Sequence, residues 1–206
     1  MLYAIIAVVA AYLLGSISFA VLFGKWFINK DVRSYGSGNA GMTNVMRVAG
    51  VIPGLLTFVC DALKSVVSCF IGYKLFGLAN PDIAIYGAWG CGIVCLLGHI
   101  FPLYFDFKGG KGVASGLGVL IYCCPLAAAI CLVAFAILFI CTRIISISSL
   151  VAVVTALITA FIQFKLPESD WVLFLLVLSV GVLIIIKHKD NIKRLIKGEE
   201  KKLKVK

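Results

Sequence analysis

The stretch VASGLGVLIYCCPLAAAICLVAFAILFI, residues 113–140, decides how often this chain can cross a membrane. It carries no charged side chain, and it exceeds the roughly 20 residues that one helix needs to span the hydrocarbon core of a bilayer. Pro125 lies near its middle, and proline bends or ends a helix because it lacks a backbone N–H. The stretch therefore forms either one long helix or two short helices that meet at Pro125.

The composition indicates that lipid, rather than water, surrounds most of the chain. Hydrophobic residues make up 62% of the 206 residues, and the mean hydropathy is +1.10. Soluble domains are only about 45–50% apolar, which excludes an ordinary soluble fold. Further apolar runs lie at Leu2–Phe23, Val51–Phe76, Ile83–Leu97, Ile144–Phe164 and Trp171–Ile186. Runs of about this length are the usual membrane-spanning unit.

The placement of Lys and Arg favours two helices in residues 113–140. With seven spans, most cations fall on one side: those of residues 25–47, Lys108, Lys111, Arg143 and nine in the basic tail, residues 187–206. The loops on the other side hold little charge beyond Asp82, Lys165, Glu168 and Asp170. With one helix instead, Arg143 and the basic tail would lie outside, although short loops rich in Lys and Arg stay in the cytoplasm.

We therefore predict an all-α, polytopic membrane helix bundle with seven transmembrane helices, some of them short. The N-terminus is expected outside, because Lys25, Lys30 and Arg33 follow the first apolar run and no cation precedes it. The C-terminus is then cytoplasmic. No internal repeat or linker divides residues 1–206, so we expect a single domain.

Several classes of function are disfavoured by the same composition. The eight cysteines lie in or beside apolar runs, as small buried hydrophobic residues do, and they have no His, Asp or Glu beside them in a metal-ligand pattern. We expect no disulfide framework, no metal and no cofactor. The basic tail suits anionic lipid. Because no folded basic domain accompanies it, nucleic acid is not expected as a partner.

Asp61 and Lys64 lie well inside the apolar run Val51–Phe76. A charge at the centre of a membrane helix costs about 2.5–3.5 kcal/mol on insertion scales. A spacing of three residues puts both side chains on one helix face, where they can pair. The sequence leaves two interpretations open: a neutralised pair that faces the bundle, or a pair that shapes a polar cavity.

Two segments rich in glycine, small polar residues and cations interrupt the apolar chain. They are SYGSGNAGMTNVMR, residues 34–47, and GHIFPLYFDFKGGKG, residues 98–112. Exposed backbone N–H groups beside Arg or Lys suit phosphate oxygens. Neither segment is a nucleotide-binding motif, since no strand precedes the glycines at 36–41 and no Ser or Thr follows Lys111. Such segments between spans indicate chemistry on a lipid or its precursor.

Three further polar groups have both a structural and a functional interpretation. They are His99; Arg143, Ser146 and Ser149; and His188 with Asn191. A spacing of three residues puts the members of the second and third groups on one helix face. Such side chains either cap or hydrogen-bond their own helix or donate to a phosphate, and spacing alone does not choose.

The chain resembles the bacterial membrane acyltransferases that use acyl phosphate to acylate glycerol 3-phosphate at its 1-position. The resemblance rests on Gly15-Ser-Ile, GSGNAGMTNVMR (36–47), GHIFPLYFDFKGGKGVASGLG (98–118), TRIISISSL (142–150) and HKDNIKRLIKGE (188–199), in the family's order. Departures are Ser18, Met42 and Ser115, where the family commonly has Pro, Ala and Thr. None of them removes a cation or a phosphate donor. The resemblance also implies seven spans.

The resemblance implies a multi-pass enzyme of the bacterial cell (inner) membrane. It would acylate the 1-hydroxyl of sn-glycerol 3-phosphate from acyl phosphate, giving lysophosphatidic acid and inorganic phosphate, the first committed step of phospholipid synthesis. Besides the two substrates and membrane lipid, a soluble enzyme that makes the acyl phosphate is a candidate partner. Catalytic roles are implied for Ser37, Arg47, Lys111, His188 and Asn191. Substrate-binding roles are assigned to Gly38, Asn39, Asn44, His99, Lys108, Gly109, Gly110, Arg143, Ser146 and Ser149.

Direct attack of the hydroxyl on the acyl carbonyl is the expected route. The backbone N–H groups around Ser37 and Gly38 are candidates for an oxyanion hole. The base is either His188, since histidine titrates near neutrality, or a substrate phosphate, whose second pKa is about 6. The resemblance favours the phosphate. A transporter would show inverted repeats, and a CDP-alcohol phosphotransferase would need an acidic metal motif, for which only Asp61 is available.

Overall fold

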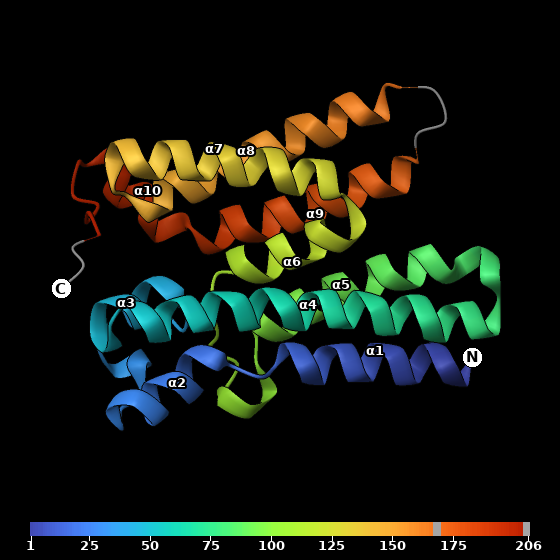
Figure 1. Ribbon diagram of the computed structural model, residues 1–206, viewed down its shortest axis with the longest axis horizontal. Helices are drawn as coiled ribbons and strands as arrows, with labels where there is room; N and C mark the ends of the chain where they lie inside the picture. The colour runs from blue at the N-terminus through green and yellow to red at the C-terminus, as the bar shows by residue number, and fades with distance from the viewer. Residues whose placement is uncertain (167–169, 204–206) are drawn as a thin grey trace.

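The computed structural model describes residues 1–166 and 170–203, and Figure 1 shows them as a bundle of helices. The helices are α1 Leu2–Gly15, α2 Phe19–Ile28, α3 Met42–Ala49, α4 Val51–Ala79, α5 Ala84–Ile100, α6 Val113–Cys123, α7 Pro125–Thr142, α8 Ile145–Phe164, α9 Trp171–Lys187 and α10 Lys189–Ile196. Short 3-10 turns lie at Val32–Ser34, Pro81–Ile83 and Leu103–Phe105. The described residues contain no strand, which confirms the all-α prediction. Glu168 and residues 204–206 of the basic tail lie outside the described residues.

Residues 113–140 form two helices, as the charge pattern predicted. α6 ends at Cys123, and Pro125 is the first residue of α7, where its missing N–H breaks no helical hydrogen bond. Helices long and apolar enough to cross a membrane occupy Leu2–Ile28, Val51–Ala79, Pro81–Phe105, Pro125–Thr142 and Ile145–Phe164 among the described residues. α9 meets the same test only together with α10, across a 60° bend, and α6 is shorter. The count of seven spans and their orientation stay predictions.

The first apolar run is broken, although the sequence predicted one helix over Leu2–Phe23. α1 ends at Gly15 and α2 begins at Phe19. The Ser16 hydroxyl donates to the Tyr12 carbonyl at 2.8 Å, and Ser18 adopts an extended conformation. The break leaves the Ile17 carbonyl free of the helix, and Lys64 Nζ donates to it at 2.7 Å. The break therefore supplies a backbone carbonyl, outside the helical hydrogen-bond pattern, that accepts from the buried Lys64 ammonium.

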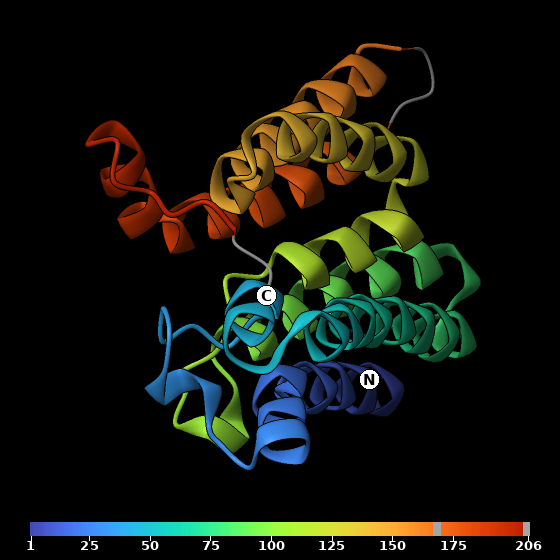
Figure 2. The ribbon, with the colours of Figure 1, turned by 60° about the vertical axis from the view of Figure 1, so that its left-hand side comes forward.

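The helices form two groups with α6 between them (Figures 1 and 2). α4 lies at the centre of the first group and packs against α1, α3, α5 and α6. α7, α8 and α9 form the second group, in which α8 contacts both of its neighbours. Leu96 of α5, Val119 of α6 and Val180 of α9 belong to one buried cluster that joins the groups. The functional cavity opens between these two groups.

Small residues and free thiols fill the helix contacts. α1 buries Ala7, Ala11 and Gly15, a spacing of four that lets membrane helices approach closely. All eight cysteines are free. Five of them are buried, as predicted for small hydrophobic side chains, whereas Cys60 and Cys123 are half-buried and Cys141 is exposed.

Candidate active site

A cavity of about 1130 Å³ runs from the two glycine-rich segments into the space between the helix groups. Its polar end is lined by Ser37, Gly38, Asn39, Asn44, Arg47, His99, Lys111, Ser146, Ser149, His188, Asn191, Arg194 and Glu200. Its apolar arm is lined by Leu117, Leu132, Phe135, Phe139, Ala152, Ala156, Val177 and Ile184, among others. One cavity thus brings the five predicted catalytic residues together and joins them to a channel that suits a hydrocarbon chain.

Asn44 holds the first glycine-rich segment in shape. It is fully buried, and its Nδ2 donates to the carbonyls of Val32 and Tyr35 at 2.7 and 3.0 Å. Its Oδ1 accepts the Ser37 N–H at 2.8 Å. All of these partners are backbone atoms. Asn44 therefore stabilises the loop conformation, and its amide is not free to bind a ligand in the cavity.

The predicted oxyanion hole at Ser37 and Gly38 is wrong. The Ser37 N–H is taken by Asn44, and the Gly38 N–H donates to the Tyr35 carbonyl at 3.0 Å. The turn closes on itself, which the glycine pattern alone did not reveal. The first turn of α3 follows directly, and its residues Met42 and Thr43 line the cavity. N–H groups in a first helical turn have no partner within the helix and favour anions.

The second glycine-rich segment is fastened to His99. The Gly110 N–H donates to the His99 carbonyl at 3.1 Å, and a Cβ on Gly110 would lie 2.2 Å from His99 Nε2. A larger residue would push the segment away. Gly109 and Gly110 therefore pack against His99 and are not part of the cavity lining. They set the position from which Lys111 enters the cavity.

Two predicted ligands lie away from the cavity. Lys108 is exposed and follows Asp106 and Phe107, whose left-handed φ angles of 55° and 57° turn the chain outward. Arg143 is exposed at the left-handed C-cap of α7, and its carbonyl accepts the Leu203 N–H at 2.7 Å. Neither lines the cavity. The helical spacing that grouped Arg143 with Ser146 fails because α8 begins only at Ile145.

Asp61 and Lys64 form the expected pair, and His99 completes a buried triad. Lys64 Nζ lies 2.8 Å from Asp61 Oδ1, and both side chains are only 3% exposed. His99 Nδ1 lies 3.1 Å from Lys64 Nζ and 3.4 Å from Asp61 Oδ1. Asp61 and His99 also line the cavity, so the pair both neutralises itself and contributes to the cavity floor.

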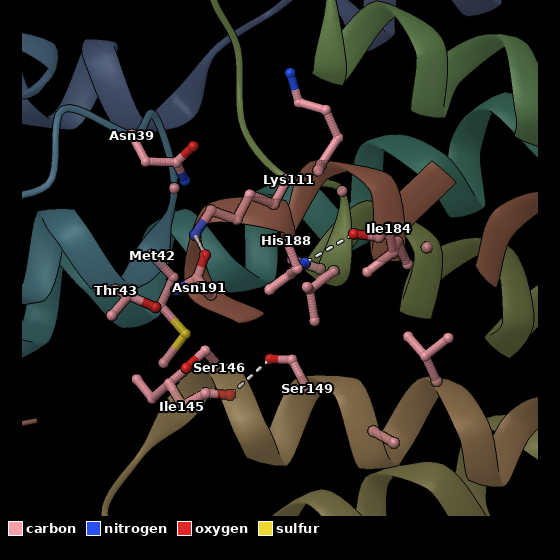
Figure 3. A pocket seen from close by; sticks show the side chains of 18 of the residues that line it. Asn39, Met42, Thr43, Lys111, Ile145, Ser146, Ser149, Ile184, His188 and Asn191 are labelled. Carbon is pink, nitrogen blue, oxygen red and sulfur yellow. Dashed lines mark hydrogen bonds between the residues drawn. The ribbon is translucent and has the colours of Figure 1, made fainter. Parts of the chain in front are cut away.

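Lys111 and Asn191 meet at the cavity mouth. Lys111 Nζ donates to Asn191 Oδ1, and Figure 3 shows the two side chains tip to tip. Burial lowers the pKa of Lys111 to about 8, although the Glu200 carboxylate favours the charged form. Lys111 is therefore still mostly charged near pH 7 but partly stripped of water, and such a cation is a strong potential partner for a phosphate oxygen.

His188 and Ser149 both hydrogen-bond their own helices (Figure 3). His188 Nδ1 lies 2.8 Å from the Ile184 carbonyl, so Nδ1 carries the proton and Nε2 is left as an acceptor. Burial lowers the pKa of His188 to about 4, which keeps the ring neutral near pH 7. The Ser149 hydroxyl donates to the Ile145 carbonyl at 2.9 Å. Its oxygen can still accept a hydrogen bond.

Sequence reasoning missed Glu200 and Arg194. Glu200 Oε1 accepts from Ser146 Oγ at 2.8 Å and from Asn191 Nδ2 at 2.6 Å, and Oε2 accepts from Arg194 Nε at 2.6 Å. The basic tail was predicted to lie along lipid, but after α10 it turns at Gly198, whose φ is +71°. Gly198 could have indicated this turn from the sequence, because a glycine just after a helix commonly reverses the chain.

A cavity with a cationic polar end and an apolar arm, inside a bundle of membrane-length helices, indicates an integral membrane protein whose cavity suits an anionic amphiphile. The sequence model described as "Glycerol-3-phosphate acyltransferase" matches residues 5–198. The chain belongs to the glycerol-3-phosphate acyltransferase family, as the resemblance in sequence predicted.

Individual relatives match over almost their full lengths. A glycerol-3-phosphate acyltransferase of Finegoldia magna is 38% identical over 98% of this chain and 97% of its own. Glycerol-3-phosphate acyltransferase 2 of Bacillus anthracis is 39% identical over 97% and 98%. The crystal structure of PlsY (YgiH), an integral membrane glycerol 3-phosphate acyltransferase, in its glycerol 3-phosphate form gives a TM-score of 0.85 at 36% identity, covering 98% of this chain and 96% of that one. Its lysophosphatidic acid form gives 0.84 at 34%, covering 98% and 95%.

Proposed function

We propose that this protein transfers an acyl group from acyl phosphate to the 1-hydroxyl of sn-glycerol 3-phosphate. The products are lysophosphatidic acid and inorganic phosphate. The observation that carries the proposal is the single cavity, which joins Arg47 and Lys111 to an apolar arm between α7, α8 and α9. The relatives solved in glycerol 3-phosphate and lysophosphatidic acid forms support the acceptor and the product.

The polar end is suited to two phosphates held close together. Arg47 offers a planar, bidentate grip, whereas Lys111 offers a point charge. The first turn of α3, at Met42 and Thr43, adds backbone donors where negative charge develops on the acyl oxygen. The acyl chain lies in the apolar arm. Holding both substrates in this geometry supplies much of the rate, because it replaces a collision by an oriented contact.

The chemical step is direct acyl transfer. A bond forms between the glycerol O1 and the acyl carbon, the bond from that carbon to the phosphate oxygen breaks, and the hydroxyl proton passes to the departing phosphate. The pKa of His188, near 4, makes it a weak base at neutral pH. Among the described residues no hydrogen bond joins a serine hydroxyl to a histidine ring. An acyl-serine intermediate would need such an activating base.

The test is turnover with a defined donor. Purified protein in detergent is mixed with palmitoyl phosphate and glycerol 3-phosphate, and inorganic phosphate and the lipid product are measured together. We expect equal amounts of phosphate and 1-acyl lysophosphatidic acid, and no product from palmitoyl-CoA. Turnover with palmitoyl-CoA alone would overturn the donor assignment. Product acylated at the 2-hydroxyl would overturn the position of attack.

We also propose a bacterial inner-membrane location with seven spans, the N-terminus outside and the C-terminus cytoplasmic. The cations of the polar end support this orientation, since they would then face the cytoplasm. There a soluble enzyme that makes acyl phosphate could deliver it. Alkaline phosphatase becomes an active enzyme only outside the cytoplasm. Alkaline phosphatase fused after residue 206 should therefore be inactive, and alkaline phosphatase fused near Lys165 should be active. The reverse pattern would invert the topology.

A further inference from the structure

The end of the described chain folds back into the cavity. After the turn at Gly198, the Leu203 N–H donates to the Arg143 carbonyl at 2.7 Å, which ties this segment to the loop before α8. Arg47 Nη2 contacts the Lys201 carbonyl at 3.4 Å. The Glu200 side chain, only 8% exposed, is thereby inserted among the groups that would hold substrate phosphates.

Glu200 fixes which way the Asn191 amide points. Asn191 Nδ2 donates to Glu200 Oε1 at 2.6 Å, while Asn191 Oδ1 accepts from Lys111 Nζ. The reversed amide would turn its two N–H groups toward an ammonium and its oxygen toward a carboxylate, and both contacts would be repulsive. The order Glu200, Asn191, Lys111 is therefore a directional chain of hydrogen bonds that ends on the lysine.

Glu200 also joins two helices across the cavity mouth. Its Oε1 accepts from Ser146 at the start of α8, and its Oε2 accepts from Arg194 on α10. Three donors converge on one carboxylate, and hydrogen bonds to a charged acceptor are about twice as strong as neutral ones. The carboxylate thus sets the distance between the helix ends that carry Ser146 and Asn191.

We propose that Glu200 is a positioning residue for acyl transfer, which acts through Asn191 to orient Lys111. This inference rests on the role of Lys111 in the proposed function. Glu200 itself does not touch substrate in this role. Substrate phosphates accept from the remaining N–H donors of Lys111 and Arg47. The Glu200 carboxylate keeps its hydrogen bonds from Ser146, Asn191 and Arg194.

The charges around Lys111 make this role measurable. Arg47 on α3 and Arg194 on α10 oppose the charged lysine, while Asp190 on α10 and Glu200 favour it. His188, at the end of α9, is neutral. Removing the Glu200 charge therefore leaves Lys111 facing two cations and one carboxylate, and its pKa falls below about 8. The alkaline limit of activity then moves to lower pH.

The experiment compares Glu200→Gln with Glu199→Gln in the full chain. Glu199 is exposed and lies outside the cavity lining, so its variant makes the same change of charge without the contacts. We expect Glu200→Gln to lower kcat/KM roughly 10- to 100-fold, the range seen in metalloenzymes when a hydrogen-bond partner of a metal-binding residue is removed. We expect the loss to grow from pH 6.5 to pH 8.5, and Glu199→Gln to match the wild type at both pH values. Glu200→Asp keeps the charge, so it should lower kcat/KM while retaining the wild-type pH profile.

Two outcomes would overturn the inference. The same loss at every pH, with a lowered melting temperature, would give Glu200 a merely structural role. Higher kcat/KM in Glu200→Gln would show that the carboxylate competes with substrate phosphate. Equilibrium dialysis of glycerol 3-phosphate, over the same pH range, separates this test from the donor assignment. If wild type binds glycerol 3-phosphate but does not turn over palmitoyl phosphate, the donor fails, and the binding series alone decides the role of Glu200.

Discussion

The molecule contains two buried polar clusters that handle charge in different ways. In the membrane-level cluster, Asp61 and Lys64 neutralise each other at 2.8 Å, and His99 closes the group. At the cavity mouth, Lys111, Arg47 and Arg194 face the carboxylates of Glu200 and Asp190.

The difference separates structural from functional charge. A closed pair satisfies itself and holds helices together, whereas an excess of cations at a cavity is costly unless an anion arrives. We therefore expect the mouth cluster to bind phosphate and the membrane-level cluster to stabilise the fold. Substitutions that break one cluster and leave the other in place test this difference.

The largest effect is expected from Lys64→Met, which leaves Asp61 as an uncompensated buried charge and removes the donor to Ile17. Breaking one partner of a buried pair costs about 3–5 kcal/mol. Thermal unfolding in detergent should show a marked loss, while Lys74→Met, an exposed lysine of the same helix, should leave the melting temperature unchanged. The double variant Asp61→Leu with Lys64→Met should recover much of the stability. No recovery would contradict the closed-pair interpretation.

Lys111→Ala should come next, and it should act on rate rather than on folding. Removing one preorganised donor to a developing charge costs about 10²- to 10³-fold in kcat, or about 2.7–4 kcal/mol. Phosphate release from palmitoyl phosphate measures it. Lys108→Ala is the matched control, because it removes a lysine three residues away that lies off the cavity. Equal losses of activity in both variants would mean that the overall positive charge of the segment matters, rather than the position of Lys111.

The sequence predicted the features that depend on composition and period. Apolar runs, the break at Pro125 and the pairing of Asp61 with Lys64 follow from the cost of polar groups in lipid. It also identified the main cavity residues, because Arg47, Lys111 and Asn191 stand in blocks that resemble a family. The break at Ser16–Ser18 and the return of Glu200 were missed because their partners, Lys64 and Ser146, lie far away in the chain. The outward turn of Lys108 was missed because it depends on left-handed φ angles at Asp106 and Phe107, which are unusual for residues other than glycine.

A smaller effect is expected from pH, because Lys111 must be charged to hold phosphate. Its pKa of about 8 lies below the ordinary value, so the charged form dominates below pH 8 and is lost as pH rises. Between pH 7 and pH 9, kcat/KM, which reports the free enzyme, should fall about tenfold. Lys111→Arg should be slower but should lack this alkaline limb, since a guanidinium stays charged. If the Lys111→Arg variant shows an alkaline fall in kcat/KM with the same pKa, that fall belongs to a group other than Lys111.

The smallest effect is expected from His188→Gln, which tests whether the mouth cluster needs a protein base. A true general base contributes about 10²- to 10⁴-fold. The His188 ring is neutral, its Nδ1 is bound to the Ile184 carbonyl, and its pKa lies near 4, so we expect less than about a tenfold loss in kcat. A glutamine amide can keep the hydrogen bond to Ile184. Any acid limb near pH 6, the second pKa of a phosphate, should then persist in the variant, because it belongs to the substrate. If His188→Gln instead loses kcat by about 100-fold or more and its residual activity shows no acid limb, the histidine rather than the departing phosphate takes the proton.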